Sequence, residues 1–191
     1  MNVPDKKIFI DQMLNLNIDS ALSYVRVYPA FLSFFRERKV ISRDDFVIGA
    51  NFTYAWMPTI LDLNGDDRHW DFLAELLTQA KAKRITDKKK LAFLARIINN
   101  SLVGASKLLH FANPREHAIW DSRVYFYLNN EKGYAYRMNK EDNYINYLTI
   151  CEQISGWEGV PDAVTSISNK LGYQVTPFRA IELTMFVNGK D

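Results

Sequence analysis

Residues 101–124, which read SLVGASKLLHFANPREHAIWDSRV, decide how the chain folds. Apolar residues recur there at helical spacing, at Ile98, Leu102, Ala105, Leu109 and Ala112. This spacing predicts a helix from Leu102 to about Phe111 with that stripe in the core. Ser101 can cap the start of the helix, and Pro114 ends it. After a short extended loop, Asp121 can cap a further helix that we expect to run to about Leu128.

The residues before this stretch predict the first arm of a helical hairpin. Apolar residues at Leu91, Leu94 and Ile97 follow a restart of the chain at Thr86. Asn99-Asn100 then interrupts the pattern with residues that prefer caps and turns to helix interiors. We therefore predict a helix, a short turn and a second helix.

The rest of the chain is also helical in its periodicity, without the alternation that marks β-hairpins. Further helices are expected from Asp19 or Ser20 to about Arg38 with a kink at Pro29, from Ser42, from the turn at 64–67 to about Arg84, and from Pro177 to Val187. Glycines at 133, 156, 159 and 172 divide the remainder into further helices. The expected fold is a compact all-α, multi-helix domain over residues 1–191, or two lobes with a cleft near 100–124.

Composition narrows the class of protein. A chain of 191 residues with 48% hydrophobic residues can form a core, which excludes fibrous and disordered classes. Cys151 is the single cysteine, so an internal disulfide, a cysteine zinc site and an iron–sulfur cluster are excluded. The most apolar stretch, 21–35, carries Arg26 and is too short for a bilayer. We expect a cytoplasmic protein without signal peptide or membrane segment.

Positive charge is concentrated in one part of the chain. Residues 81–123 contain ten basic and three acidic residues, a net charge of +7, whereas the whole chain carries +2. Such a segment can neutralise phosphates. A solvated helix face around Lys88–Lys90 is the alternative.

Lys107 lies about 200° around the predicted helix from Ala105, and therefore away from the apolar stripe. Gly104, His110 and Phe111 fall beside it at three- and four-residue spacing. Because Gly104 has no side chain, it leaves room there for a closely approaching ligand or backbone.

With these motifs the chain resembles the helix-hairpin-helix DNA glycosylases, and more closely the bacterial and phage proteins with the oxidised-guanine DNA glycosylase fold. The likeness covers about 25 residues closely and lies in Leu108-Leu109-His110-Phe111, Pro114, the run Ile119-Trp120-Asp121-Ser122-Arg123-Val124 and the tail 177–183. The chain departs from the family at the hairpin, where a Gly-x-Gly is usual and only Gly104 is present. The spacing of 14 residues between Lys107 and Asp121 is also shorter than usual.

The resemblance implies base excision from damaged or modified DNA. Asp121 corresponds to the carboxylate that supports the cationic sugar as the N-glycosidic bond breaks. Lys107 is the candidate amine that would form a Schiff base and add abasic-site lyase activity. The implied partner is DNA, duplex or single-stranded, with the target base flipped out. Contacts to it are expected from Gly104, His110, Trp120, Arg123, Lys88 and Lys89, and aromatic material for a pocket exists in Phe52, Tyr54, Trp56 and Trp120.

No cofactor, metal or membrane is expected, because the three histidines lack ligand spacing. Two other functions stay open: a catalytically inactive DNA-binding sensor of the same fold, and a helical protein-interaction domain. Asp121 alone could be an N-cap, Lys107 a solvated lysine and His110 a buried structural histidine. Arg179 and Glu182, at i and i+3, are interpreted as a structural ion pair.

Overall fold

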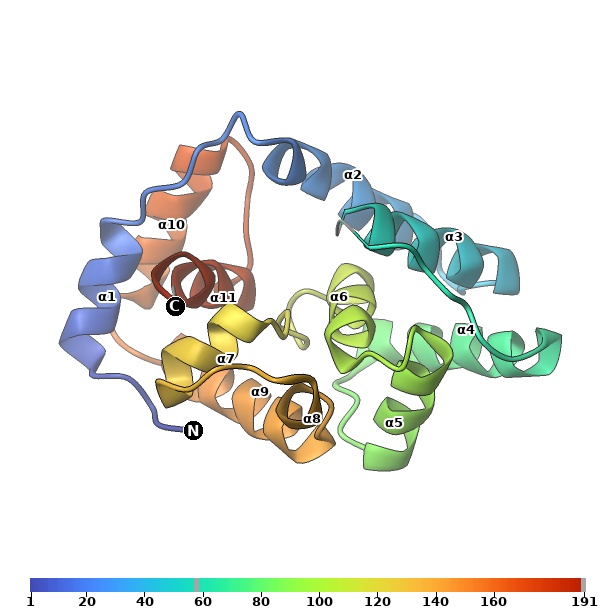
Figure 1. The fold of residues 1–191 in the computed structure, drawn as a ribbon. Coiled ribbons are helices and arrows are strands. Elements are labelled where there is room, and N and C mark those ends of the chain that lie inside the picture. Colours follow the sequence, from blue (N-terminus) through green and yellow to red (C-terminus); the bar gives the residue numbers. More distant parts are fainter. Residues whose placement is uncertain (57–58, 190–191) are drawn as a thin grey trace.

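The computed structural model describes residues 1–56 and 59–189, and this part of the chain is built from α-helices (Figure 1). The helices are α1 Lys6–Leu14, α2 Ser23–Arg36, α3 Arg43–Ala55, α4 Asp67–Ala82, α5 Lys88–Ile97, α6 Leu102–Ala112, α7 Ser122–Asn129, α8 Ala135–Met138, α9 Glu141–Ser155, α10 Val160–Leu171 and α11 Pro177–Asn188. One antiparallel bridge, between Leu63 and Ile98, joins the α3–α4 connection to the α5–α6 turn. The predicted all-α class is confirmed.

The helices form two groups (Figure 1). In the first, α3 packs on α4, α5 packs on α6, and both α2 and α3 cover α6. In the second, α11 packs against α7, α9 and α10, and α1 lies against α10 and α11. Contact between α5 and α9 joins the two groups.

Helix α6 is the most deeply placed element. The predicted core stripe is confirmed, with Leu102, Ala105 and Leu109 fully buried. The other side of the helix is buried too, because α2, α3, α4 and α5 all pack around it. Lys107 and His110, placed by the sequence pattern on the side away from the core, are therefore both buried.

Several helix starts are capped as predicted. Ser42 forms a reciprocal capping box with Asp45, and Ser101 and Asp121 each accept a backbone N–H of the first turn that follows. Each such cap stabilises a helix by about 1 kcal/mol. Helix α5 is capped by Asp87, one residue after the expected restart of the chain at Thr86. A carboxylate accepts two amides there, from Lys89 and Lys90.

Two features at the N-terminal end differ from the sequence expectation. Helix α1 was not predicted, although Asp5 caps it and it buries Phe9 and Met13. Helix α2 begins at Ser23, because the carboxylate of Asp19 accepts the N–H of Ala21 in a preceding turn.

The α5–α6 hairpin turns through two asparagines in the left-handed region, Asn99 with φ 52° and Asn100 with φ 49°. Asparagine tolerates this conformation better than most residues. The turn is held from both sides: Asn99 donates to the carbonyl of Ile60, and Asn139 donates to the carbonyl of Asn100. Asn139 also accepts the N–H of Leu102 at 3.1 Å, so the protein itself satisfies part of the first turn of α6.

Candidate active site

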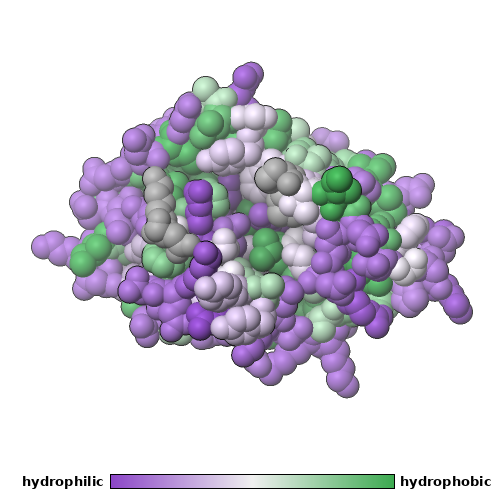
Figure 2. Space-filling model, viewed as in Figure 1, coloured by the Kyte–Doolittle hydropathy of each residue, from purple (hydrophilic) through white to green (hydrophobic). Residues whose placement is uncertain are grey.

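A pocket of about 230 Å³ opens between the two groups of helices. Its wall is formed by Tyr24, Trp56, Lys107, Ile119, Asp121, Arg179, Glu182, Leu183 and Phe186. Five of these side chains are aromatic or aliphatic and four are charged. Figure 2 shows hydrophilic and hydrophobic residues intermixed over one face of the molecule. A concave apolar pocket with a few converging polar groups is typical of a small-ligand site.

Lys107 and Asp121, the two residues singled out by sequence, meet in this pocket. The Lys107 Nζ lies 3.6 Å from the Asp121 Oδ2, with side chains 10% and 17% exposed. Lys107 comes from the middle of α6, whereas Asp121 is the N-cap of α7 and also accepts the N–H of Arg123 at 3.1 Å. Capping thus uses one carboxylate oxygen of Asp121 and leaves the other toward the amine.

Burial sets the state of the amine. It lowers the pKa of Lys107, because removal from water disfavours the ammonium form, and the charges of Asp121 and Glu182 oppose this shift. The Lys107 Nζ also lies 6.0 Å from the centre of the Trp56 ring. A lysine in such surroundings has a larger neutral fraction than an exposed one, as an amine nucleophile requires.

A second carboxylate, Glu182, lines the same pocket. It pairs with Arg179 one turn earlier on α11, and both side chains are almost completely buried. Burial raises the pKa of Glu182 to about 7; the Arg179 charge opposes this shift and the Asp121 charge adds to it. The ion pair inferred from the i, i+3 spacing is confirmed. Its place in the pocket wall was missed, although two charges within an otherwise apolar helix were the available signal.

The guanidinium of Arg179 packs against two aromatic rings. Its guanidinium carbon lies 4.7 Å from the ring centre of Tyr28 and 5.6 Å from that of Trp56. The Tyr28 hydroxyl lies 2.7 Å from His110 Nε2, and His110 Nδ1 lies 2.6 Å from the carbonyl of His117. A carbonyl only accepts, so Nδ1 carries the proton and Nε2 accepts from Tyr28.

His110 is therefore a neutral link between α2 and the loop before α7. Burial lowers its pKa to about 3, with the nearby Arg179 charge acting in the same direction. It is completely buried and does not line the pocket. His110 was expected to contact DNA, but here it supports Tyr28 and, through Tyr28, the position of Arg179.

Gly104 and Trp120 are also enclosed. The space beside Gly104 is filled by Tyr54, whose hydroxyl would lie 2.3 Å from a Cβ at this position. Trp120 is fully buried and donates from its indole nitrogen to the carbonyl of Met138 at 3.0 Å. Neither residue lines the pocket, although both were expected to contact the ligand.

The three basic residues expected to contact DNA do not lie together in the structure. Arg123 is exposed, and its guanidinium lies 4.7 Å from the ring of Phe186, which places it at the pocket rim. Lys88 and Lys89 instead begin α5, at the end of that helix away from the hairpin turn. Lys88 is paired with Asp142 of α9 at 2.6 Å, and Lys89 lines another groove, beside Phe72.

Of the four aromatic residues proposed for a pocket, Trp56 lines it. Phe52 is stacked on Phe31 within an aromatic cluster, and Tyr54 packs against α6. Tyr24 and Phe186 complete the aromatic part of the wall. Sequence could not select them, because they lie on the first and last thirds of the chain and meet only in the fold.

Within residues 1–56 and 59–189, no group of three or more histidine, cysteine or acidic side chains is placed to hold a metal ion. None of the described helices is both long and apolar enough to cross a membrane. No known protein-family model matches the chain, and neither the curated proteins nor the solved structures yield a significant match.

Proposed function

We propose that this chain is a DNA glycosylase-like enzyme that releases a damaged or modified base, with Asp121 and Lys107 at the reacting sugar. The observation that carries the proposal is the Lys107–Asp121 pair, 3.6 Å apart and shielded from water at an aromatic-walled pocket. The two residues are 14 positions apart in the sequence and come from different helical elements, α6 and the start of α7.

Each group has a role that its surroundings favour. The carboxylate of Asp121 stabilises positive charge that develops on the sugar as the N-glycosidic bond breaks, and a partly dry site strengthens this interaction. The Lys107 amine, in its neutral form, attacks the anomeric carbon, and the base departs with the bonding electrons. Loss of a proton from nitrogen and opening of the sugar ring then give a Schiff base.

The pocket suits a flipped base. Its volume of about 230 Å³ is below the roughly 300–1,000 Å³ of sites for drug-sized ligands, and therefore suits a single heterocycle. Trp56 and Tyr24 offer aromatic surfaces, and Arg179 with Glu182 offers a donor and an acceptor for the edge of a base. Arg123 at the rim is available to a backbone phosphate.

The proposal is tested by borohydride trapping on oligonucleotides, duplex and single-stranded, that carry abasic, oxidised-guanine, uracil or alkylated sites. We expect a covalent adduct with the unmodified chain and none with Lys107→Ala. Asp121→Asn should lower base release at least about a hundredfold, as loss of one electrostatic transition-state contact does elsewhere. Lys7→Ala removes an exposed lysine of α1 that does not line the pocket; it is the matched control and should trap normally.

Two other outcomes have defined meanings. Base release without an adduct would assign Lys107 an electrostatic role and make the enzyme monofunctional, with water as nucleophile. If no base is released from any substrate, the catalytic proposal is wrong. Salt-dependent DNA binding would then support the sensor function, and its absence the protein-interaction domain.

A further inference from the structure

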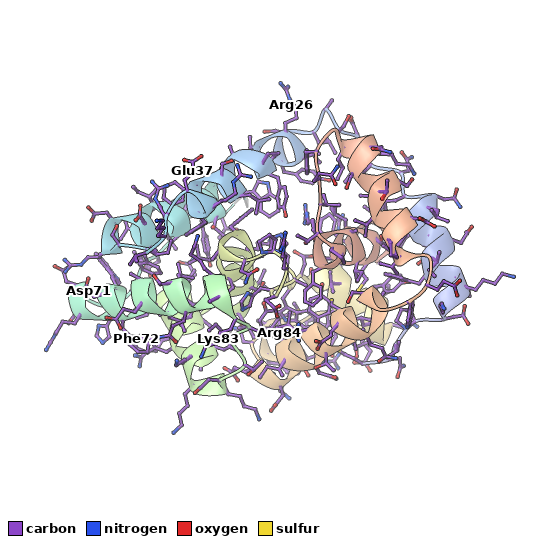
Figure 3. The ribbon with its side chains drawn as sticks, turned by 180° about the vertical axis from the view of Figure 1, so that it is seen from behind. Arg26, Glu37, Asp71, Phe72, Lys83 and Arg84 are labelled. Atoms are coloured by element: carbon purple, nitrogen blue, oxygen red, sulfur yellow. The ribbon has the colours of Figure 1, made fainter. Side chains whose placement is uncertain are left out.

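A second cavity, of about 420 Å³, lies where the ends of α2, α4 and α6 meet the loop before α11. Figure 3 shows the molecule from behind, with Glu37 marking the end of α2 and Lys83 and Arg84 following the end of α4. The cavity shares no lining residue with the candidate active site. Arg36, Lys81 and Arg115 line it, and no acidic residue within 1–56 and 59–189 does.

None of these three cations is paired with a carboxylate in the described part of the chain. Arg38, Arg43, Arg84 and Arg137 each have a carboxylate within 4.0 Å, whereas Arg36, Lys81 and Arg115 have none among the described residues. Glu116, which follows Arg115 in the chain, is paired with Arg84, as is Glu152. Like charges that converge on one cavity repel each other, and a bound anion would relieve this repulsion.

The position of Lys81 strengthens the argument. Its Nζ donates to the carbonyl of Phe35 at the end of α2, which holds the amine at the cavity wall. Burial lowers the pKa of Lys81, and the charge of Arg38 lowers it further. An anion in the cavity would raise the pKa of Lys81 again. It would also bind more tightly because the amine is already held in position.

The frame of the cavity is fixed by hydrogen bonds. Asn113 donates to the carbonyls of Ala80 and Lys81, at 3.0 and 3.1 Å, and accepts the N–H of Arg115 at 3.1 Å. Thr176 donates to the carbonyl of Pro114 at 2.6 Å and caps α11. The loop that carries Arg115 is thus tied to α4 on one side and to the positive end of the α11 dipole on the other.

We propose that this cavity binds a phosphate group, carried by a nucleotide or by the DNA backbone. Two arginines and a lysine without carboxylate partners match the charge of a phosphate, and arginine can bind its oxygens in a bidentate manner. Leu32, Phe111 and Pro114 provide an apolar floor for the organic part of the ligand. An adjoining cavity of about 560 Å³ shares Arg115 and Thr176 and extends the groove past the start of α11.

The test is isothermal titration at low ionic strength with four probes: deoxyguanosine monophosphate, deoxyguanosine, inorganic phosphate and a short undamaged DNA duplex. We expect Arg36→Ala and Arg115→Ala each to weaken binding of a phosphate-bearing probe about tenfold, because each removes a charge-assisted contact. Arg26→Ala, at an exposed position of the same helix α2, is the matched control and should change affinity less than twofold. Deoxyguanosine should bind at least tenfold more weakly than its monophosphate.

The arms of the test separate the two sources of phosphate. If the affinity for the monophosphate or for inorganic phosphate falls in both arginine variants, the ligand is a free phosphate compound. If the affinity for the duplex falls instead, and the slope of log affinity against log salt concentration decreases by about one per arginine removed, the ligand is the DNA backbone. Binding in the candidate active site is recognised by loss in Asp121→Asn, which this proposal expects to leave phosphate affinity unchanged. If no phosphate-bearing probe depends on Arg36 or Arg115 more than on Arg26, the proposal is overturned.

Discussion

The candidate active site and the phosphate cavity gather charge in opposite ways. In the active site, Lys107, Asp121, Arg179 and Glu182 are buried and balance each other, two cations against two anions. In the phosphate cavity, Arg36 and two other cations line the wall, and no acidic residue of the described chain lines it with them. Buried charges must be compensated by the protein itself, because desolvation costs several kcal/mol per ion. Charges at the surface can be left for a ligand to compensate.

The comparison is tested most severely at Arg179. Arg179→Met removes one partner of a buried pair and leaves Glu182 without compensation, so we expect the free energy of unfolding to fall by about 3–5 kcal/mol. Urea unfolding measures the loss. The double variant Arg179→Met/Glu182→Leu should recover most of it. A loss below about 1 kcal/mol in the single variant would show that the pair is not buried in solution.

Low pH should destabilise the protein through the buried histidines near the candidate active site. Burial lowers the pKa of His110 to about 3 and that of His117 to about 4, below the ordinary value of 6.5. The unfolded chain then binds more protons, so stability is fully present above pH 6.5 and falls as pH drops toward 4, by about 1.4 kcal/mol per pH unit for each histidine.

Glu182 contributes with the opposite sign between pH 4.5 and 7. Its raised pKa favours the folded state at low pH, and this contribution is lost as pH rises through about 7. Urea unfolding at pH 7, 5.5 and 4.5 gives the net slope. Replacing His110 by glutamine should make the slope shallower in the range below pH 6.5, and an unchanged slope would contradict the neutral, buried state of this histidine.

The close contact between Gly104 and Tyr54 predicts a moderate effect on the free energy of unfolding. In Gly104→Ala the new methyl group meets the Tyr54 ring, with the hydroxyl at 2.3 Å. We expect a loss of about 1–3 kcal/mol in unfolding free energy, reduced by the better helix propensity of alanine. Tyr54→Phe removes the closest atom, so the double variant Gly104→Ala/Tyr54→Phe should be more stable than Gly104→Ala. Tyr54→Phe alone should not stabilise the unmodified chain. Stabilisation by Gly104→Ala alone would show that the space is open.

The smallest effect is expected in the phosphate cavity. Arg36→Ala and Arg115→Ala should each change the free energy of unfolding by less than about 0.5 kcal/mol, because both side chains are exposed and unpaired with carboxylates. Thermal melting without ligand is sufficient. A loss comparable to that of Arg179→Met would mean that these arginines serve the fold and not a ligand.

Local signals in the sequence were sufficient for the starts of α3, α6 and α7. Ser42, Ser101 and Asp121 are caps whose oxygen reaches an amide two or three residues away, so the information is contained in a few neighbouring positions. Helix α1 was missed because it is only nine residues long and its burial depends on α10 and α11. Propensity is a weak guide where tertiary packing decides.

For the site, sequence supplied the Lys107–Asp121 pair but not its surroundings. Periodicity identified one buried face of α6 and could not reveal that four other helices would enclose the rest. Glu182 and Tyr24 reach the pocket from α11 and α2, and only the fold shows that these helices meet there. The groups missed were those whose neighbours are distant in sequence.

Helix α1 packs on α10 and α11, the last two helices of the described chain (Figure 1). This arrangement has a consequence during synthesis: α1 stays without its docking surface until residues 160–188 have emerged from the ribosome. The α2–α6 group, whose contacts are closer in sequence, can assemble earlier because shorter loops close at lower entropic cost. Arg179 and Glu182 belong to the late part, so the pocket forms as one of the last steps of folding.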